Sequence, residues 1–407
     1  RIDVVMLLAG CCILPRGSIA RQDPLEVRIK SGVVRGKTVS LPDDRGDTLA
    51  FLGIPFAEPP VGDLRFREPV PISKWDGGYD ATNFGNSCMQ QLEKLYPDFP
   101  GAQMWDPNTP VSEDCLYLNV WTPSPKPNNA AVMVWIYGGA FIGGTASLDV
   151  YDGKYLAGTQ DIIMVSMNYR VGSFGFLATG DQRATGNYGM YDQVLALKWV
   201  KSNIGAFGGN PNRITIFGES AGAASVGLHL LSPLSEPLFN RAILQSGTPD
   251  AEWAVMTHDE AETRSQILGS FHGCNFAQSD FVDCLRNVNA SDLSALEWVT
   301  SQFSKMPWTP IVDGKFLLND PKSLVSNGQF KNADVLLGSV KDEGTYFILY
   351  GFVPGYEKDS TNLQTYENYL ANVDYTNSDL NTCSRAAIKD HYTHWESPMM
   401  VLLTVIT

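Results

Sequence analysis

Five short apolar runs between residues 131 and 338 constrain the fold more than any other feature of the chain. Each has about the length of a strand and lacks the polar alternation of a strand with one wet face, as expected for strands buried on both faces of a parallel sheet. The runs are 131–137, 162–167, 214–217, 242–244 and 335–338. Residues 188–204 and 222–231 lie between runs and place apolar side chains three and four apart, as helices do. Strands that alternate with helices predict a doubly wound α/β fold, with a mostly parallel central sheet and helices on both faces.

The part of the chain before residue 131 has a different pattern. Residues 25–34 alternate apolar and polar around Ser31-Gly32, which predicts an antiparallel hairpin and hence a small N-terminal antiparallel sheet. Residues 38–110 are rich in Pro, Gly and Asp without sustained periodicity, and we interpret them as ordered loops that cover an edge. Because no repeat or linker divides the chain, we expect a single domain over residues 21–398 and an atypical tail at 399–407.

Residues 1–20 carry the features of a secretory signal peptide. The apolar run from Val4 to Leu14 follows Arg1 and precedes small residues up to Ala20, after which we expect cleavage; a buried helix is the alternative. The run is shorter than the roughly 18 residues that a membrane span requires. Since the chain does not begin with Met, we expect this signal to be incomplete.

The cysteines and one glycosylation motif agree with secretion. Two pairs are spaced locally enough for an oxidising compartment to bridge them, namely Cys88 with Cys115 and Cys274 with Cys284. Cys383 is then left without a partner. Asn289 begins an Asn-Ala-Ser acceptor sequence for N-glycosylation.

The charge of the chain limits its partners. Thirty Lys and Arg against 44 Asp and Glu give a formal net charge of −14 at pH 7. This charge repels nucleic-acid phosphates and anionic lipids and attracts cations. We therefore exclude nucleic acid as a partner. Separately, we expect neither a cofactor nor a metal ion.

The strongest chemical motif is Gly218-Glu219-Ser220-Ala221-Gly222, which lies between an apolar run and a helical stretch. The two glycines fall where a sharp strand-to-helix turn needs residues without Cβ, and such a turn exposes Ser220 Oγ at the carboxyl end of the sheet. The alternative is a structural turn with an idle serine. We predict that Ser220 is a nucleophile.

A hydroxyl that attacks a carbonyl needs a stabiliser for the anion that forms. Gly138-Gly139-Ala140-Phe141 directly follows the run at 131–137, so the N–H groups of Gly139 and Ala140 are expected to face the same point as that of Ala221. Alternatively, these glycines only form a turn.

The nucleophile also needs a base and an orienting acid, in the chain order Ser, acid, His. Asp342-Glu343-Gly344 follows the last apolar run, and the residues alone do not choose between the two acids. Only His391 and His394 follow them, and neither lies after a further strand or beside a glycine. We therefore expect the chain as given to lack its base and to be inactive.

Four segments together give the chain a resemblance to the cholinesterases of the type-B carboxylesterase family. They are residues 51–55, 113–121, 135–139 and 217–222, and the resemblance extends from about residue 25 to about residue 395. It implies an α/β-hydrolase fold with Ser220 as nucleophile and Glu343, rather than Asp342, as triad acid. It also implies an oxyanion hole formed by Gly139, Ala140 and Ala221, together with both disulfides.

The resemblance implies a secreted, synaptic esterase that hydrolyses acetylcholine to choline and acetate through an acyl-Ser220 intermediate. A quaternary ammonium has no proton to donate, so aromatic faces and diffuse negative charge must hold it. The implied substrate-binding residues are Trp105, Glu219, Tyr346 and Phe347 around the choline, Ser304 and Met306 at the acyl group, and Trp298, Tyr350 and Glu93 at a peripheral cation site. Trp253 is a further implied substrate-binding residue. Taken singly, such aromatics are more typical of core packing.

Two other functions stay open at this point. One is a butyrylcholine-preferring or general carboxylesterase, against which Trp105 argues. The other is a non-catalytic, cholinesterase-like adhesion protein, against which Ser220 argues. The resemblance also implies a C-terminal part that this chain does not contain, with the triad His, the last strands and helices through which the full-length protein could form homo-oligomers.

Overall fold

The computed structural model describes residues 23–42, 45–92, 94, 98–300, 306–341, 343 and 381–392, the last five of these by their backbone alone. The expected signal peptide at 1–20 and the tail at 399–407 lie outside the described residues. Within these ranges no helix combines the length and the apolar character needed to cross a lipid bilayer.

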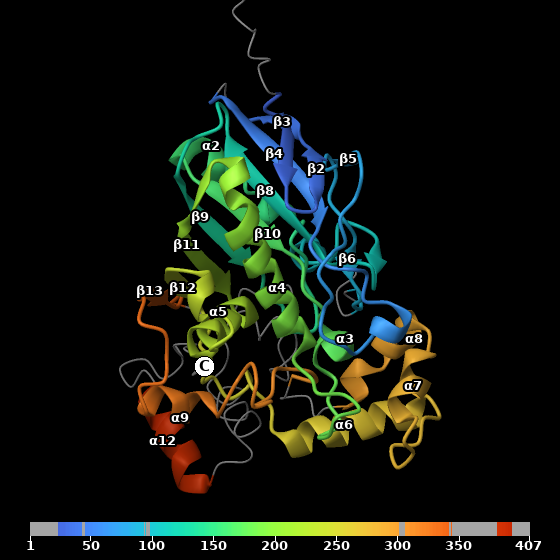
Figure 1. Ribbon diagram of the computed structural model, residues 1–407. Coiled ribbons are helices and arrows are strands. Elements are labelled where there is room, and N and C mark those ends of the chain that lie inside the picture. The colour runs from blue at the N-terminus through green and yellow to red at the C-terminus, as the bar shows by residue number, and fades with distance from the viewer. Residues whose placement is uncertain are drawn as a thin grey trace, which may run out of the picture.

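One large sheet forms the centre of the molecule (Figure 1). In spatial order its strands are β13 (Asp334–Gly338), β12 (Arg241–Gln245), β11 (Gly209–Glu219), β9 (Ala130–Ile136), β10 (Ile163–Met167), β8 (Tyr117–Pro123), β4 (Asp47–Pro55) and β3 (Lys37–Ser40). The five strands from β13 to β10 run parallel, and each coincides with one of the predicted apolar runs. The predicted α/β fold with a mostly parallel sheet is thus confirmed.

Burial along the parallel strands follows their place in the sheet. Every residue of β10 is buried between its two neighbours, as predicted. The prediction is wrong for β13, whose five residues are all exposed, because in the described part of the chain only β12 pairs with it.

The other half of the sheet is antiparallel and corrects the interpretation of residues 38–110 as loops. β3 and β4 lie in that range, and β4 pairs with β8, which was not among the predicted strands either. β4 is buried from Thr48 to Ile54, so it shows no alternation. A register shift between Phe51 and Ile54 breaks its pattern further, since Gly53 between them adopts a positive φ of 67°.

Two smaller sheets lie outside the central one. The predicted hairpin is confirmed as β1 (Glu26–Ile29) antiparallel to β2 (Gly32–Arg35). The small sheet is not purely antiparallel, because β5 (Gly78–Asp80) joins β2 in parallel. The other small sheet pairs β6 (Ser87–Cys88) with β7 (Val111–Ser112).

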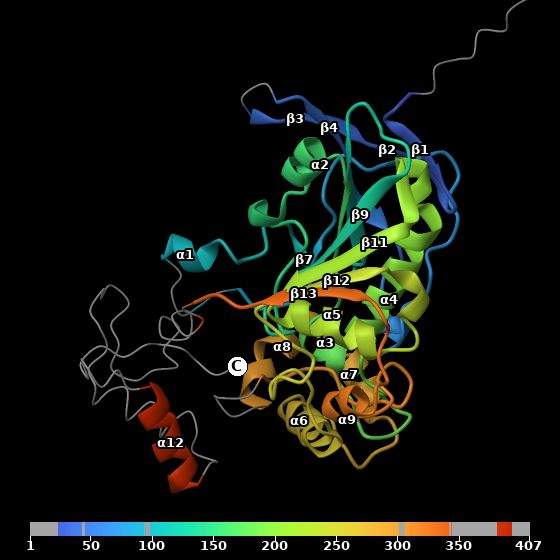
Figure 2. The same cartoon turned by 90° about the vertical axis from the view of Figure 1, so that its left-hand side faces the viewer.

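Helices cover both faces of the central sheet (Figure 2). The α-helices of the described residues are α1 (Pro100–Gln103), α2 (Lys154–Gln160), α3 (Gly172–Phe176), α4 (Tyr188–Asn203), α5 (Ala221–Leu231), α6 (His258–Phe271), α7 (Phe281–Arg286), α8 (Ala290–Ala295), α9 (Pro321–Ser326) and α12 (Thr382–Tyr392), of which α1 and α12 stand apart from the sheet. α2 packs on β4, β8 and β10, whereas α4 and α5 lie on the opposite side, against β11 and β12. The two predicted helices are confirmed as α4 and α5.

Glu297 is a buried carboxyl that joins the short 3₁₀ turn Glu297–Thr300 to α3. Its side chain is 3% exposed, and Oε1 accepts a hydrogen bond from the Ser173 N–H at 2.5 Å. The carboxyl also packs directly on Gly172, where a Cβ would lie 2.4 Å from Oε1. Burial raises the pKa of Glu297 to about 7, although the hydrogen bonds with Ser173 act in the opposite direction.

We predict that Glu297→Gln changes how stability depends on pH. Below the ordinary pKa of 4.5 the carboxyl is protonated in both the folded and the unfolded chain, so it carries no penalty there. As the pH rises towards 7 the unfolded chain releases this proton first, and the wild type loses about 3 kcal/mol of its free energy of unfolding. The variant has no such proton to lose. Urea unfolding measured from pH 4 to pH 8 should show that the free energy of unfolding of the variant rises relative to that of the wild type by this amount. If the free energies of the two proteins change with pH in the same way, Glu297 does not have the raised pKa.

Candidate active site

Ser220 stands at a sharp turn between β11 and α5. Its φ of 54° and ψ of −121° are values that a residue with a Cβ rarely adopts. Its N–H donates to Gln245 O at 2.9 Å, and its C=O accepts from the Ala224 N–H at 2.9 Å. β12 and the first turn of α5 therefore hold both sides of the strained residue. The predicted strand-to-helix turn is confirmed, and the nucleophilic role of Ser220 stays a prediction.

Glycines let the end of β9 touch this turn directly. A Cβ on Gly222 would lie 2.1 Å from Ile136 O, and a Cβ on Gly218 would lie 2.6 Å from the same oxygen. On the other side, a Cβ on Gly138 would lie 2.6 Å from Glu219 O. No side chain fits at these three positions without displacing backbone.

The loop that follows β9 is strained as well. Gly139, Ala140 and Phe141 all have positive φ, at 109°, 57° and 62°, and two of them are L residues for which this region is costly. The loop folds back on itself, since the N–H groups of Ile142 and Gly143 donate to Gly139 O. The buried Phe141 ring packs edge-on against Phe176, with 5.3 Å between ring centroids.

Three N–H groups in this region are the expected oxyanion donors. Among the described residues, none accepts a hydrogen bond from the N–H of Gly139, Ala140 or Ala221. That of Ala221 is also at the N-terminus of α5, where the helix dipole favours negative charge. The site can therefore offer donors to an anion.

Two carboxyl groups near the Ser220 turn, those of Glu219 and Glu343, influence each other electrostatically. Burial raises the pKa of Glu219 to about 7, and the nearby charge of Glu343 adds to the rise. Glu219 is exposed over part of its surface, so water tempers this effect. Glu343 is fixed by the Val340 N–H, which donates to its Oε1 at 2.9 Å. The implied triad acid thus lies near the turn, while Asp342 lies outside the described residues.

Tyr151 was not found by sequence reasoning. Its ring lies 4.9 Å from that of Trp135, which in turn lies 4.9 Å from Phe217 in β11. Burial, and to a lesser degree the charge of Glu219, raises the pKa of Tyr151. No motif in the sequence marks this tyrosine.

The structure places the implied aromatic residues unequally. Trp253 lies beside the loop of residues 138–144, which we call the oxyanion loop, and its ring centroid is 6.4 Å from that of Phe141. Trp105 and Trp298 are 41% and 46% exposed, and no hydrogen bond or ring contact among the described residues joins either to Ser220. The main-chain oxygen of Met306 accepts from Arg264 Nη1. Glu93, Ser304, Tyr346, Phe347 and Tyr350 lie outside the described residues.

His229 is the histidine nearest to Ser220 in sequence, and it is not available as a base. It is buried in α5, and its ring nitrogens contact Ser235 Oγ at 2.7 Å and Gln193 Oε1 at 2.9 Å. Burial lowers its pKa to about 3, so it stays neutral. The side chains of His391 and His394 lie outside the described residues, and the missing base stays a prediction.

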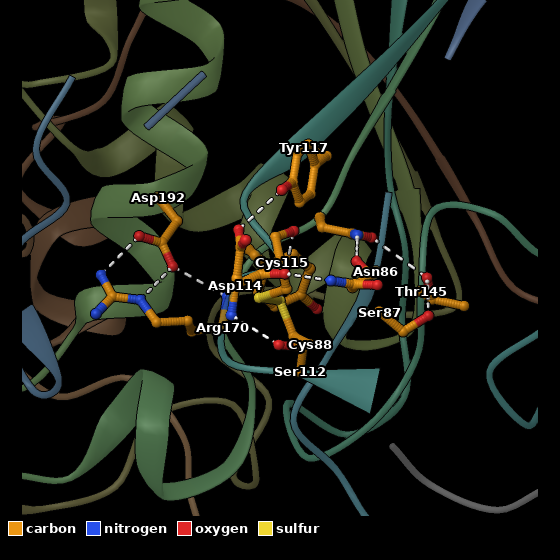
Figure 3. The surroundings of a disulfide bond; sticks show 12 residues. Asn86, Ser87, Cys88, Ser112, Asp114, Cys115, Tyr117, Thr145, Arg170 and Asp192 are labelled. Carbon is orange, nitrogen blue, oxygen red and sulfur yellow. Dashed lines mark hydrogen bonds and ion pairs between the residues drawn. A yellow bond between two sulfur atoms is a disulfide. The ribbon is translucent and has the colours of Figure 1, made fainter. Parts of the chain in front are cut away.

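Both expected disulfides form, Cys88–Cys115 and Cys274–Cys284. The loop that the Cys88–Cys115 disulfide closes carries Trp105. Hydrogen bonds join this loop and the neighbouring Ser87 to Thr145 and Ser147, which directly follow the oxyanion loop. Ser87 Oγ donates to Thr145 Oγ1 at 2.9 Å (Figure 3). Asn108 makes two hydrogen bonds with Ser147, at 2.6 and 2.7 Å. Cys383 is exposed and free, and Asn289 is exposed at the start of α8.

Comparisons with known proteins identify relatives over nearly the whole chain. The profile described as "Carboxylesterase family" matches residues 23–400. The chain is 47% identical over 401 residues to the acetylcholinesterase of Bungarus fasciatus, a match that covers 97% of this chain and 65% of that protein. It is 50% identical over 383 residues to the acetylcholinesterase of Danio rerio, covering 92% and 60%. It is 47% identical over 387 residues to the cholinesterase of Mus musculus, covering 94% and 64%. The chain thus spans less than two thirds of the length of these relatives.

We predict that Gly222→Ala destabilises the protein, because the new Cβ would overlap Ile136 O and push α5 away from β9. The loss in free energy of unfolding should be near the upper end of the about 1–3 kcal/mol typical of overpacking. Gly205→Ala is the matched control, since a Cβ there meets no atom within 4 Å. It should leave stability unchanged or raise it by up to about 1 kcal/mol. Equal urea midpoints for the two variants would refute the close contact.

Proposed function

The chain belongs to the carboxylesterase family, and from that premise we propose that it is a cholinesterase-type serine esterase whose substrate is acetylcholine. The observation that carries the proposal is Ser220, held in a strained conformation beside N–H groups that have no acceptor in the part of the chain that the structure describes. An idle serine would not require that strain. This favours an enzyme over a non-catalytic adhesion protein.

The reaction follows the two-step route of serine esterases. Ser220 Oγ attacks the ester carbonyl while a general base, oriented by Glu343, removes its proton. The N–H groups of Gly139, Ala140 and Ala221 stabilise the oxyanion, and choline leaves with the proton. Water then attacks the acetyl-Ser220 ester, which releases acetate and restores the hydroxyl.

The cation of the substrate is the proposed basis of selectivity. The exposed indole of Trp105 offers a π face to a quaternary ammonium. A cation close to Glu219 would favour its ionised form and so counteract the burial that raises its pKa. Trp253 beside the oxyanion loop, together with Tyr346 and Phe347, completes the proposed choline pocket. The net charge of −14 favours approach of a cation to the protein as a whole.

Location and a second binding site are further parts of the proposal. Two disulfides and the exposed Asn289 support an extracellular protein, with N-glycosylation at Asn289. Trp298, with Glu93 and Tyr350, is the proposed peripheral cation site, and its 46% exposure leaves the indole open to a ligand. A butyrylcholine-preferring or general carboxylesterase is the second candidate function, which Ser304 and Met306 favour because they are smaller or more flexible than aromatic residues.

We predict that Trp105→Ala separates charged from uncharged substrates in the full-length protein. A cation–π contact contributes about 0.5–1 kcal/mol at an exposed indole and about 2 kcal/mol when the bound ligand desolvates it, so its loss should lower kcat/KM for acetylthiocholine about threefold to thirtyfold. The 3,3-dimethylbutyl thioester, in which carbon replaces the ammonium nitrogen, should lose far less. Ser220→Ala serves as the inactive control for both substrates. Equal losses for the two esters would favour a general esterase.

Acyl selectivity gives a separate prediction. With Ser304 and Met306 at the acyl group, butyrylthiocholine should be hydrolysed within roughly tenfold of acetylthiocholine. Met306→Phe should restore acetyl preference, because the ring fills the space of the butyryl tail. The ratio of the two kcat/KM values before and after the substitution is the measurement. A wild-type preference for acetyl above about a hundredfold would show that another side chain closes the pocket.

A further inference from the structure

We infer that Gln90 is a positioning residue of the proposed reaction, because its side-chain amide holds the oxyanion loop, residues 138–144, in its strained conformation. The inference rests on the proposed function and deepens it. Gln90 lies two residues after Cys88, carries no charge, and belongs to none of the catalytic motifs.

The contacts of Gln90 form a clamp on one residue of the loop. Its Nε2 donates to Gly144 O at 2.8 Å, and its Oε1 accepts from the Gly144 N–H at 2.8 Å. Nε2 also donates to Cys88 O at 3.0 Å, which ties the amide to the disulfide. The residue is only 6% exposed, so water does not readily replace these bonds. Only an amide side chain supplies both the donors and the acceptor that this arrangement uses.

The position of Gly144 affects the whole oxyanion loop, because the two ends of the loop are in contact. Gly144 has a φ of 106°, and a Cβ there would lie 2.6 Å from Gly138 O. In the same way a Cβ on Gly139 would lie 2.4 Å from Gly143 O. A shift of Gly144 is therefore transmitted to Gly138 and Gly139, and so to the expected oxyanion donors.

The loop needs such a clamp because its own conformation is unfavourable. Three successive residues with positive φ persist only where their surroundings hold them. One hold is at Phe141, whose C=O accepts from the Gly172 N–H at 2.7 Å. Gly172 in turn packs on the buried carboxyl of Glu297. Gln90 supplies the second set of stabilising hydrogen bonds, at Gly144, the last residue of the loop.

The test compares Gln90→Met, which keeps the length of the side chain and loses both hydrogen-bonding functions, with Asn203→Leu. Asn203 is the matched control because it is also 6% exposed and also joins two backbone segments. Its amide accepts from the Lys30 N–H at 2.9 Å and donates to Trp199 O at 3.0 Å, in contact with neither the oxyanion loop nor Ser220. Both variants lose a buried amide, so a merely structural role predicts similar effects.

Hydrogen–deuterium exchange of the present chain is the first measurement, and it needs no activity. In Gln90→Met the amides of Ile142, Gly143 and Gly144 should exchange at least about tenfold faster than in the wild type, because local opening of the loop becomes easier. In Asn203→Leu they should exchange at the wild-type rate. If Gln90→Met does not fold, Gln90→Glu replaces it, since it keeps the acceptor for Gly144 and loses the donor. Unchanged exchange in the loop would overturn the inference.

Steady-state kinetics of the full-length protein is the second measurement. Removal of one oxyanion donor costs about 10²–10³ in kcat, so displacement of the loop should lower kcat about tenfold to a hundredfold. KM for acetylthiocholine and the affinity for tetramethylammonium should stay within about twofold, because the ammonium site is not touched. A kcat no lower than that of Asn203→Leu would overturn the positioning role. Absence of hydrolysis by the wild type would instead refute the proposed function, and the exchange data would still show whether the clamp exists.

Discussion

Direct backbone contact between the end of β9 and the turn at Ser220 is the constraint on which the rest of the structure depends. Gly218 and Gly222 each allow Ile136 O to approach the turn more closely than any side chain permits. The contact brings the loop after β9 beside Ser220, and it fixes where α5 begins. The strain of both segments is concentrated there, and the strands on either side are packed tightly enough to sustain it.

Features that depend on neighbours in sequence were predictable, and those that depend on distant partners were not. The parallel strands and the turn at Ser220 follow from local runs and glycine spacing. β4 was missed because Gly53 interrupts its apolar run and breaks its register, inside a segment rich in Pro, Gly and Asp. The bonds of Gln90 to Gly144 and the contact of Tyr151 with Trp135 link residues far apart in the chain. No local pattern announces such pairs, since only the folded backbone brings them together.

Two acids with a raised pKa form a second theme of the molecule. Glu219 and Glu297 both have a pKa raised to about 7 by burial, and each lies against a glycine whose missing Cβ makes room for its carboxyl, Gly138 and Gly172 respectively. The enclosed Glu297 is therefore costly to the folded state near neutral pH, whereas water screens the charge of Glu219. Glu219 is exposed in part and faces the candidate site, whereas Glu297 is enclosed and supports it from behind. In both places a carboxyl group packs against a glycine next to the oxyanion loop.

The bonds from Ser87 and Asn108 to Thr145 and Ser147 join the loop that carries Trp105 to the segment that follows the oxyanion loop. These bonds do not involve Gln90, so the loop that carries Trp105 stays attached when the Gln90 contacts are lost. The position of this loop and the conformation of residues 138–144 therefore rest on separate hydrogen bonds. A substitution that alters one of the two can therefore leave the other in place, in a part of the chain that the Cys88–Cys115 disulfide also secures.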